Sequence, residues 1–480
     1  MSAIADPRQA RTFRFISCDY DATSGEASLR YAFDDGPELV ERIGFPDAPP
    51  LPAERHAAFA AALRLLHLIA GVSYYKAGVP SEILVEGYAL DTTTAQFMDQ
   101  VYFHGLAEFA YQNKLILNRS IFLLPSAEGV PRERADEGVM QPRRTSKNAP
   151  PSGGARHLLL MDEGKNLNLP RRTLVPIGGG KDSLVSVEIL KSVREPTTAV
   201  WVGDSALIAA CAQRTGLPLL NIRRTLAPEL FEYNRSGAWN GHIPVTAINS
   251  AILVCAAILH GFDAIAFSNE RSASEATLEY DGQPVNHQWS KSLEFERGLR
   301  EYTKSHIAAE LDYFSLLRPW SELAVTRAFA CQTRYDDVFS SCNRNFRIRG
   351  ERAADRWCGQ CPKCHFVFLA LAPFVAKPRL LGIFGRNLLD DAALAPGFDA
   401  LMEYRNHKPF ECVGEGRESR AAMYTLSQRP EWREDALVAR FAEEVLPQLD
   451  AAHLALTPLL QPSPEHFLPA RLRGLLDASG

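Results

Sequence analysis

The stretch Thr173-Leu-Val-Pro-Ile-Gly-Gly-Gly-Lys-Asp-Ser183 decides the fold class of this chain. Its first five residues form a short apolar run that predicts a buried strand, and residues 184–193 predict a helix directly after the loop. Three glycines between a strand and a helix allow backbone N–H groups to converge, and the N-terminus of the helix adds partial positive charge. The stretch therefore predicts a phosphate-binding site. The residues expected to bind the phosphate are Gly178, Gly179, Gly180 and Ser183.

The same loop does not match two familiar phosphate-binding motifs. A Walker-type P-loop has Ser or Thr directly after its lysine, but here Asp182 follows Lys181. The dinucleotide-binding fingerprint has a third glycine at the position that Ser183 occupies. A plain strand–helix turn does not need a lysine, an aspartate and a serine in succession after three glycines. The succession therefore favours phosphate binding over a plain turn; the candidate catalytic residues in this loop are Lys181 and Asp182.

The chain after this loop alternates between strand-like and helical segments. Strands are predicted over 198–203, 217–222 and 263–268, and helices through Cys211 and over 245–260. This alternation is typical of an α/β fold in which helices cover both faces of a parallel sheet. Ligands of such sheets bind beyond the carboxyl ends of the strands. The other polar residues expected at those ends are Asp204, Asn269 and Glu270.

The segments on either side of this core have different patterns. Near the N-terminus, 13–19 and 27–33 predict a β-hairpin, and 55–70 and 95–112 predict helices. Residues between 126 and 156 are rich in Pro, Gly, Ser and Arg, which indicates a solvated linker or a loop over the site. We expect five parts: an N-terminal α+β domain (1–125), a flexible linker or loop (126–157), the core (158–338), a cysteine cluster (339–365) and a helical region (366–480).

Length, composition and charge exclude several classes of protein. The chain has 480 residues, of which 46% are hydrophobic, and this excludes disorder of the whole chain. The 52 basic and 57 acidic residues give a net charge of −5, which argues against a nucleic-acid partner. The longest apolar run, 251–259, is far shorter than the about 20 residues of a membrane span. Because residues 1–13 do not resemble a targeting peptide, we expect a cytoplasmic protein with no membrane partner.

Four of the nine cysteines form a compact cluster. The spacing Cys-x15-Cys-x2-Cys-x2-Cys allows four thiolates to surround one Zn²⁺ at about 2.3 Å, with no position left for water. An iron–sulfur cluster is the main alternative, and His365 could replace one of the thiolates. The alternative is that the four cysteines only pack in an apolar core without a metal. The polar and charged residues around them argue against it. The candidate ligands of a structural zinc ion are Cys342, Cys358, Cys361 and Cys364.

The glycine loop resembles that of the ATP pyrophosphatases, whose usual form is Ser-Gly-Gly-Xaa-Asp-Ser. The resemblance implies an adenine nucleotide α-hydrolase-like core that splits ATP to AMP and pyrophosphate. It also implies that Gly179, Gly180 and Ser183 bind the pyrophosphate and that Asp182 helps to hold Mg²⁺. Gly178 departs from the family pattern, because it stands where these enzymes have serine. The deazaguanine-nitrile synthases have a similar layout, with a strand ending near Asn269 and a late four-cysteine cluster.

A resemblance to another family covers nearly the whole chain. The stretches 66–76, 240–249, 267–274 and 285–291 are similar to the UDP-N-acetylmuramoyl-L-alanyl-L-glutamate epimerases. This resemblance implies an ATP- and Mg²⁺-dependent enzyme of peptidoglycan synthesis, which inverts the terminal L-glutamate of that nucleotide through an acyl-adenylate and releases AMP and diphosphate. It further implies pairing with a muramyl ligase that adds L-glutamate instead of D-glutamate.

Such a reaction needs a base at the glutamate Cα and cations for the phosphates and carboxylates of the substrate. Adenylation removes the charge of the α-carboxylate, so that the neighbouring proton becomes far more acidic. The pKa of a suitable base lies near the working pH. The candidates for the base are His242, His287, Glu270, His407, Glu411 and Cys412. The candidates for substrate binding are Arg271, His287 and Lys291.

Two other functions are compatible with the same residues. The chain could be another ATP pyrophosphatase that adenylates a nucleobase or a tRNA, and the basic stretch near 140–147 would then contact RNA. The charge of −5 and the lack of a strongly basic face count against that function. The chain could also be a module without enzymatic activity that binds zinc and nucleotides.

Overall fold

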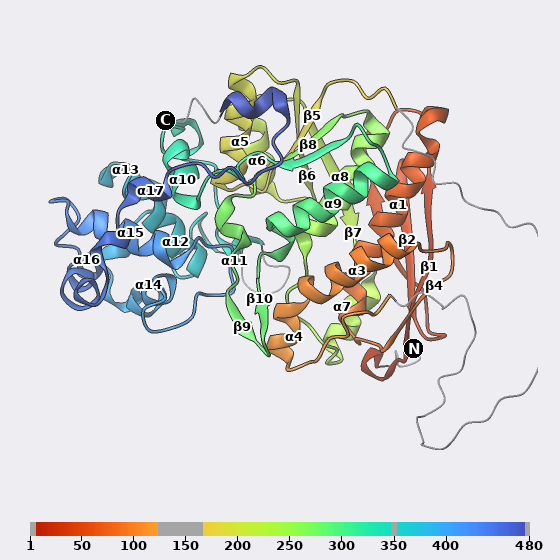
Figure 1. The fold of residues 1–480 in the computed structure, drawn as a ribbon, viewed down its shortest axis with the longest axis horizontal. Helices are drawn as coiled ribbons and strands as arrows, with labels where there is room; N and C mark the ends of the chain where they lie inside the picture. The colour runs from red at the N-terminus through yellow and green to blue at the C-terminus, as the bar shows by residue number, and fades with distance from the viewer. Residues whose placement is uncertain (1–5, 123–166, 347–352, 476–480) are drawn as a thin grey trace, which may run out of the picture.

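A nine-stranded sheet forms the centre of this protein (Figure 1). The computed structural model describes residues 6–122, 167–346 and 353–475. Within these ranges the strand order is β11-β8-β5-β6-β7-β3-β2-β1-β4. The strands of this sheet are β1 (Thr12–Asp21), β2 (Glu26–Phe33), β3 (Leu39–Gly44), β4 (Glu82–Val85), β5 (Thr173–Pro176), β6 (Thr197–Val202), β7 (Leu219–Thr225), β8 (Ala264–Phe267) and β11 (Asp312–Ser315).

The five strands from β11 to β7 are all parallel to one another. Numbered along the chain from β5, they have the spatial order 3-2-1-4-5 when read from β7, which is that of a doubly wound sheet. The order reverses between β5 and β8, and a crevice is expected beyond the carboxyl ends of these strands. The prediction of an α/β fold with a mostly parallel sheet is therefore confirmed.

The N-terminal strands continue the same sheet. Strand β3 pairs antiparallel with β7, through Arg42 to Gly44 opposite Arg223 to Thr225. Next to this junction, Arg224 donates a hydrogen bond of 2.8 Å to Glu41, whose side chain is completely buried. The predicted hairpin is confirmed as the antiparallel pair β1–β2, and β4 lies parallel to β1 at the outer edge. The predicted domain boundaries stay a prediction.

Helices cover both faces of the sheet because its strands alternate their apolar side chains between two cores. Leu174 of β5 belongs to one core and its neighbour Val175 to the other. The first core contains α1 (His56–Ala70), α3 (Thr92–Gly105), α8 (Val245–His260) and α9 (Leu293–His306). The second contains α5 (Lys181–Ser192), α6 (Ala206–Thr215) and α10 (Glu322–Ala330).

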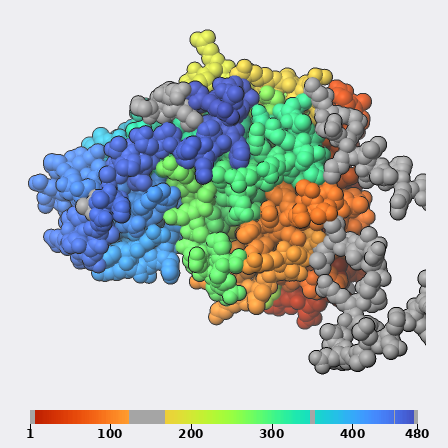
Figure 2. Space-filling model, viewed as in Figure 1, coloured from red at the N-terminus to blue at the C-terminus, as the bar shows by residue number. Residues whose placement is uncertain are grey.

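The C-terminal part is helical in its described residues and lies at the end of the molecule opposite the N-terminal strands (Figure 1). Its α-helices are α12 (Pro362–Leu371), α13 (Lys377–Phe384), α14 (Ala395–Leu401), α15 (Gly416–Ser427), α16 (Ala436–Arg440) and α17 (Leu456–Leu459). The last segment returns across the surface to the core, as Figure 2 shows in dark blue. There Arg471 forms an ion pair with the buried carboxylate of Glu195.

Two local predictions need revision. The helix expected over 95–112 is two helices, α3 and α4 (Ala107–Asn113), with a break at Leu106. The helix after the glycine loop begins at Lys181, three residues before the predicted start. The predicted linker at 126–157 lies outside the described residues.

One helical stretch in the described ranges, Ala53–Tyr75, is long and apolar enough by composition to cross a membrane. It is 78% buried within the protein, and its main helix α1 packs against α8. The stretch is thus explained as a core element.

Candidate active site

A pocket of about 300 Å³ opens where β5, β6 and β8 end. The helix α8 and segments far along the chain complete its wall, including Ser341 and Lys363. The pocket lies at the reversal of strand order, where a doubly wound sheet is expected to bind its ligand. Seven of the predicted site residues line it: Gly178, Gly180, Asp182, Ser183, Asn269, Lys291 and Cys412.

The glycine loop has the shape of an anion cradle. Gly179 has a φ of +81°, which glycine adopts without strain. Its carbonyl accepts a 2.9 Å hydrogen bond from the Ser340 N–H, and a Cβ on Gly180 would lie 2.6 Å from Ser341 Oγ. No heavy atom lies within 4 Å of the Cβ position of Gly178, so this glycine faces open space. The loop is thus fixed on one side by 340–341 and open towards the pocket on the other.

We expect Gly179→Ala to abolish binding of a phosphate ligand while the protein still folds. A side chain at this φ costs about 1–2 kcal/mol and would shift the loop peptides that face the pocket. The measurement is calorimetric titration with ATP.

Gly216→Ala is the matched control for this substitution. Gly216 has a φ of +72° at the end of α6, and no atom lies within 4 Å of its Cβ position. It should lose similar stability and keep its affinity. Equal affinities of both variants would contradict the role of the loop.

Lys181 lies behind the loop, not on the pocket wall. Its side chain is 1% exposed, and its ammonium donates hydrogen bonds to Asp182 and, at 2.6 Å, to Glu322 Oε2. Burial opposes the charged form, but these carboxylates outweigh burial and raise the pKa of Lys181. The same contact helps to lower the pKa of Asp182 against the effect of burial. Lys181 therefore positions Asp182 as an ionised carboxylate on the pocket wall.

Cys412, which lines the same pocket, belongs to a connected group of polar side chains. Its sulfur lies 3.1 Å from Lys291 Nζ and is near enough to the ring of His287 for each group to shift the pKa of the other. In that ring, His287 Nδ1 lies 2.5 Å from Glu108 Oε2. The His242 ring centroid is 4.2 Å from that of His287. Cysteine, histidine and glutamate thus form a continuous group of interacting side chains.

Burial and nearby charges shift the pKa values of Cys412, His287 and His242. Burial raises the pKa of the Cys412 thiol, but Lys291 and His287 outweigh burial and lower it well below its usual value. Burial lowers the pKa of His287, but its bonds to Cys412 and Glu108 raise it to about 9. Burial and the nearby His287 lower the pKa of His242 to about 3. The ionisation that these shifts favour is a thiolate beside an imidazolium, with a neutral His242 next to them.

Two other candidate bases are buried carboxyl groups. Burial, followed by the charges of Glu322 and Asp182, raises the pKa of Glu270 to about 8. Burial likewise raises the pKa of Glu411, which accepts a hydrogen bond from Asn343. Neither residue is part of the pocket wall, although both adjoin residues that are.

The structure places three predicted site residues elsewhere. Asp204 is exposed after β6, and His407 is exposed in a separate surface hollow with Glu403 and Arg405. Arg271 donates hydrogen bonds to the backbone carbonyls of Leu459 and Gln461, and so holds the C-terminal segment. Their roles in binding or catalysis stay predictions that the pocket geometry does not support.

Glu108 was not foreseen from the sequence. It lies on α4, 179 positions before His287, and nothing in its neighbourhood distinguishes it from other helical glutamates. Its burial in spite of its charge is visible only in the folded chain.

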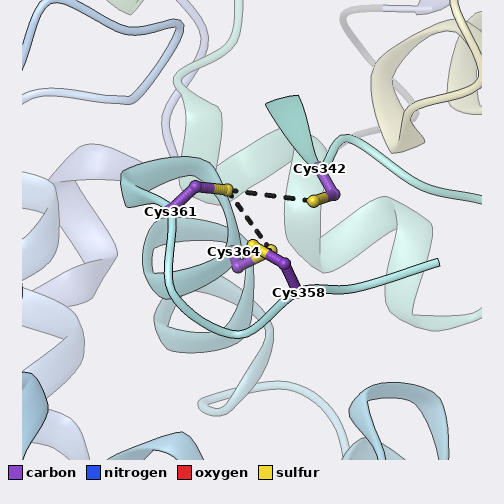
Figure 3. A group of neighbouring side chains, drawn as sticks. All are labelled: Cys342, Cys358, Cys361 and Cys364. Carbon is purple, nitrogen blue, oxygen red and sulfur yellow. Dashed lines mark hydrogen bonds between the residues drawn. The ribbon is translucent and has the colours of Figure 1, made fainter. Parts of the chain in front are cut away.

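The four clustered cysteines have the geometry of a metal site (Figure 3). The sulfur of Cys361 lies 4.0 Å from that of Cys342 and 3.4 Å from that of Cys364, which is 3.7 Å from that of Cys358. A tetrahedron of thiolates about 2.3 Å from zinc has edges of about 3.8 Å, so the cluster can bind Zn²⁺. His365 is not one of the ligands, because its ring stacks on Phe398 and its Nε2 bonds to the Gly359 carbonyl.

The cysteine cluster adjoins the pocket through the chain on both sides. Cys342 directly follows Ser340 and Ser341, which hold the glycine loop. Lys363 lies between Cys361 and Cys364, lines the pocket and donates a hydrogen bond to the Cys412 carbonyl. A metal in this cluster would therefore fix two parts of the pocket wall.

Comparisons with known proteins agree with this architecture. Residues 4–316 match the family model described as the MurL N-terminal domain, and residues 338–455 match the MurL C-terminal domain. A UDP-N-acetyl-alpha-D-muramoyl-L-alanyl-L-glutamate epimerase of Xanthomonas oryzae pv. oryzae is 54% identical over 473 residues, or 98% of each chain. Proteins of the same name from Salinispora tropica and a Micromonospora species are 40% and 39% identical, over 97% and 96% of this chain and 95% and 97% of their own lengths. The chain therefore belongs to the MurL family.

Proposed function

We propose that this protein is an isomerase of peptidoglycan synthesis, which inverts the terminal L-glutamate of UDP-N-acetylmuramoyl-L-alanyl-L-glutamate to D-glutamate. The near full-length similarity to epimerases of that name supports the substrate. One structural observation carries the chemistry: the glycine loop and the thiol of Cys412 line the same pocket. A phosphate cradle beside a reactive thiol suits a reaction that activates a carboxyl group before its neighbour is inverted.

We further propose that the pocket binds ATP in the manner of an ATP pyrophosphatase. The doubly wound strand order, the open face of Gly178 and the start of α5 at the loop support this proposal. Asp182 presents an ionised carboxylate to the pocket, and oxygen ligands of this kind suit Mg²⁺. When bound, Mg²⁺ supplies charge neutralisation at the phosphates. Lys291 and Lys363 add two cations to the wall for anionic groups.

Activation by ATP explains how an inert carbon centre becomes reactive. Removal of the Cα proton beside a free carboxylate would place a second negative charge on adjoining atoms. Attack of the carboxylate on the α-phosphate of ATP forms an acyl-adenylate, releases diphosphate and removes the first charge. The Cα proton then becomes acidic enough for a side chain to remove it. AMP is released from the activated carboxyl group, and water finally regenerates the carboxylate.

The direct test is incubation of the protein with ATP, Mg²⁺ and the L-glutamyl nucleotide, followed by hydrolysis and chiral analysis of glutamate. We expect D-glutamate to form together with AMP and diphosphate. Solvent deuterium should enter Cα only when ATP is present. L-glutamate that stays unchanged beside intact ATP would disprove the proposed function.

We expect Asp182→Asn to reduce substrate-dependent exchange of labelled diphosphate into ATP by about 100-fold or more, because the amide removes the carboxylate that faces the phosphates. Glu229→Gln is the matched control, since Glu229 also lies in the first turn of a helix but outside this pocket, on α7 (Pro228–Arg235). Undiminished exchange in Asp182→Asn would show that metal and phosphate are held elsewhere.

The structure of the proposed substrate indicates which class of enzyme must produce it. A nucleotide that ends in L-glutamate must come from a muramyl ligase that adds the L-isomer, and we propose that the two enzymes work together in the cytoplasm. The D-glutamyl product then has the configuration that a ligase adding D-glutamate would have produced directly.

A further inference from the structure

The group around Cys412 has the arrangement of an activated nucleophile. A nucleophilic side chain is typically hydrogen-bonded to a base, and a third group orients that base. Here Cys412 contacts His287, and His287 Nδ1 lies 2.5 Å from Glu108 Oε2. Lys291 Nζ, at 3.1 Å from the sulfur, supplies a cation to the thiolate. The four residues come from three distant segments of the chain, and two of them, Lys291 and Cys412, line the pocket.

The position of the thiol also suits attack on an activated carboxyl group. Cys412 is half-buried and lines the same pocket as Gly178 and Asp182, where the phosphates of an adenylate would lie. The carbonyl carbon of an acyl-adenylate is separated from its α-phosphate by a single oxygen. A nucleophile that lines this pocket is therefore placed to attack that carbon.

We propose that Cys412 takes the glutamyl group from the adenylate as a thioester, and that Cα is inverted while the substrate is joined to the enzyme. This inference rests on the proposed function. The thiolate sulfur forms a bond to the carbonyl carbon, the bond from that carbon to the phosphate oxygen breaks, and AMP leaves with the electron pair. The imidazolium of His287 keeps its proton during this step, and no oxidant or reductant takes part.

The later steps balance in the same way. Water takes up the proton that leaves Cα of the thioester, and a solvent proton is added from the opposite face. A water molecule then attacks the carbonyl carbon and gives its two protons to solvent, the bond from carbon to sulfur breaks, and the sulfur leaves as a thiolate beside the new carboxylate. Lys291 and His287 stabilise that thiolate as a leaving group, as they stabilise it before attack.

A nucleophilic role fits Cys412 better than the role of the Cα base. Its pKa lies well below the usual thiol value, because Lys291 and His287 outweigh burial. Basicity falls in full with the pKa, whereas the nucleophilicity of a thiolate falls only about half as steeply. The contacts that make Cys412 a weak base therefore leave it an effective nucleophile. A thioester also keeps the carbonyl uncharged, as inversion at Cα requires.

The test uses the full-length protein with ATP, Mg²⁺ and the L-glutamyl nucleotide, quenched in acid during turnover. We expect intact mass spectrometry to find an adduct with the mass of the substrate less one water, on the peptide that contains Cys412 and released by neutral hydroxylamine. Cys412→Ala should keep diphosphate exchange, which also shows that it folds, and lose AMP formation by about 1,000-fold. Cys412→Ser should form the adduct slowly and retain it, because an alkoxide is a poorer leaving group.

The control is Cys331→Ala, which removes an exposed thiol outside this pocket and should leave the adduct unchanged. Diphosphate exchange without any adduct would overturn the thioester alone, as would Cys412→Ala releasing AMP at the wild-type rate. A wild-type protein without substrate-dependent exchange would overturn the proposed function and the thioester together.

Glu108 is a positioning residue in this scheme, since it acts on the thiol through His287. The groups that face the thiol are Lys291, His287, Lys363 and Glu411. His242, Glu108 and Glu411 face His287. We expect Glu108→Gln to raise the pH at which iodoacetamide alkylates Cys412, while diphosphate exchange is kept. An unchanged alkylation profile would remove Glu108 from the scheme.

Discussion

Cys361→Ser is expected to yield a protein that has lost its bound metal and no longer binds ATP. The four thiolates can surround one Zn²⁺, and structural zinc sites contribute about 10–16 kcal/mol to folding in small domains. Loss of the site would release Ser340 and Ser341 from the glycine loop, and Lys363 from the pocket wall. The expected result is a metal content near zero and a lowered unfolding temperature. Elemental analysis measures the metal content, calorimetry measures the unfolding temperature, and titration measures the affinity for ATP.

Cys331→Ser is the matched control, because this exposed cysteine lies outside the cluster. It should keep wild-type metal content and stability. Elemental analysis of the wild type also distinguishes zinc from iron. If Cys361→Ser bound ATP as tightly as the wild type, the cluster would have no part in shaping the pocket.

Glu296→Ala is expected to destabilise the protein by about 3–5 kcal/mol, since it leaves a buried guanidinium without its partner. Glu296 is 1% exposed and Arg318 2%, and their side chains meet at 2.9 Å. Arg318 also donates hydrogen bonds to the backbone carbonyls of Glu270 and Lys291. The ion pair therefore helps to fix the backbone at Glu270 and Lys291, beside the pocket. Denaturant titration of the variant and the wild type measures the loss.

The control for this prediction is Glu38→Ala, which breaks an exposed ion pair with Arg30. Exposed pairs contribute about 0–1 kcal/mol, so this variant should be close to the wild type. If the two variants lost equal stability, the buried pair would have no special importance for the fold.

The parallel core could be predicted because its pattern is local. The strands β5, β6 and β8 are short, mostly apolar runs with turn residues or a helix beside them, and the glycine loop marks where β5 ends. The cysteine cluster is local in the same sense, since three of its ligands lie within seven residues. Such signals survive in a single sequence because neighbouring residues produce them.

The junction between β3 and β7 could not be predicted, because it pairs residues about 180 positions apart. The same limit applies to the active site. Cys412 was singled out by its polar loop and His287 by its segment, but nothing showed that they touch each other or Glu108. Contacts of this kind depend on how the whole chain folds. The candidate bases therefore stayed equivalent until their positions in the fold were known.

The continuity of the sheet across β3 and β7 has a consequence for how the chain can be divided. A fragment that ended at residue 122 would keep β1 to β4 but leave the edge of β3 without its partner. It would also leave Glu41 without the guanidinium of Arg224, in a place shielded from water. Open strand edges pair with other chains and cause aggregation. The N-terminal strands are therefore poorly suited to separate expression or to exchange between relatives, and the shared hydrogen bonds make them part of the folding unit that carries the glycine loop.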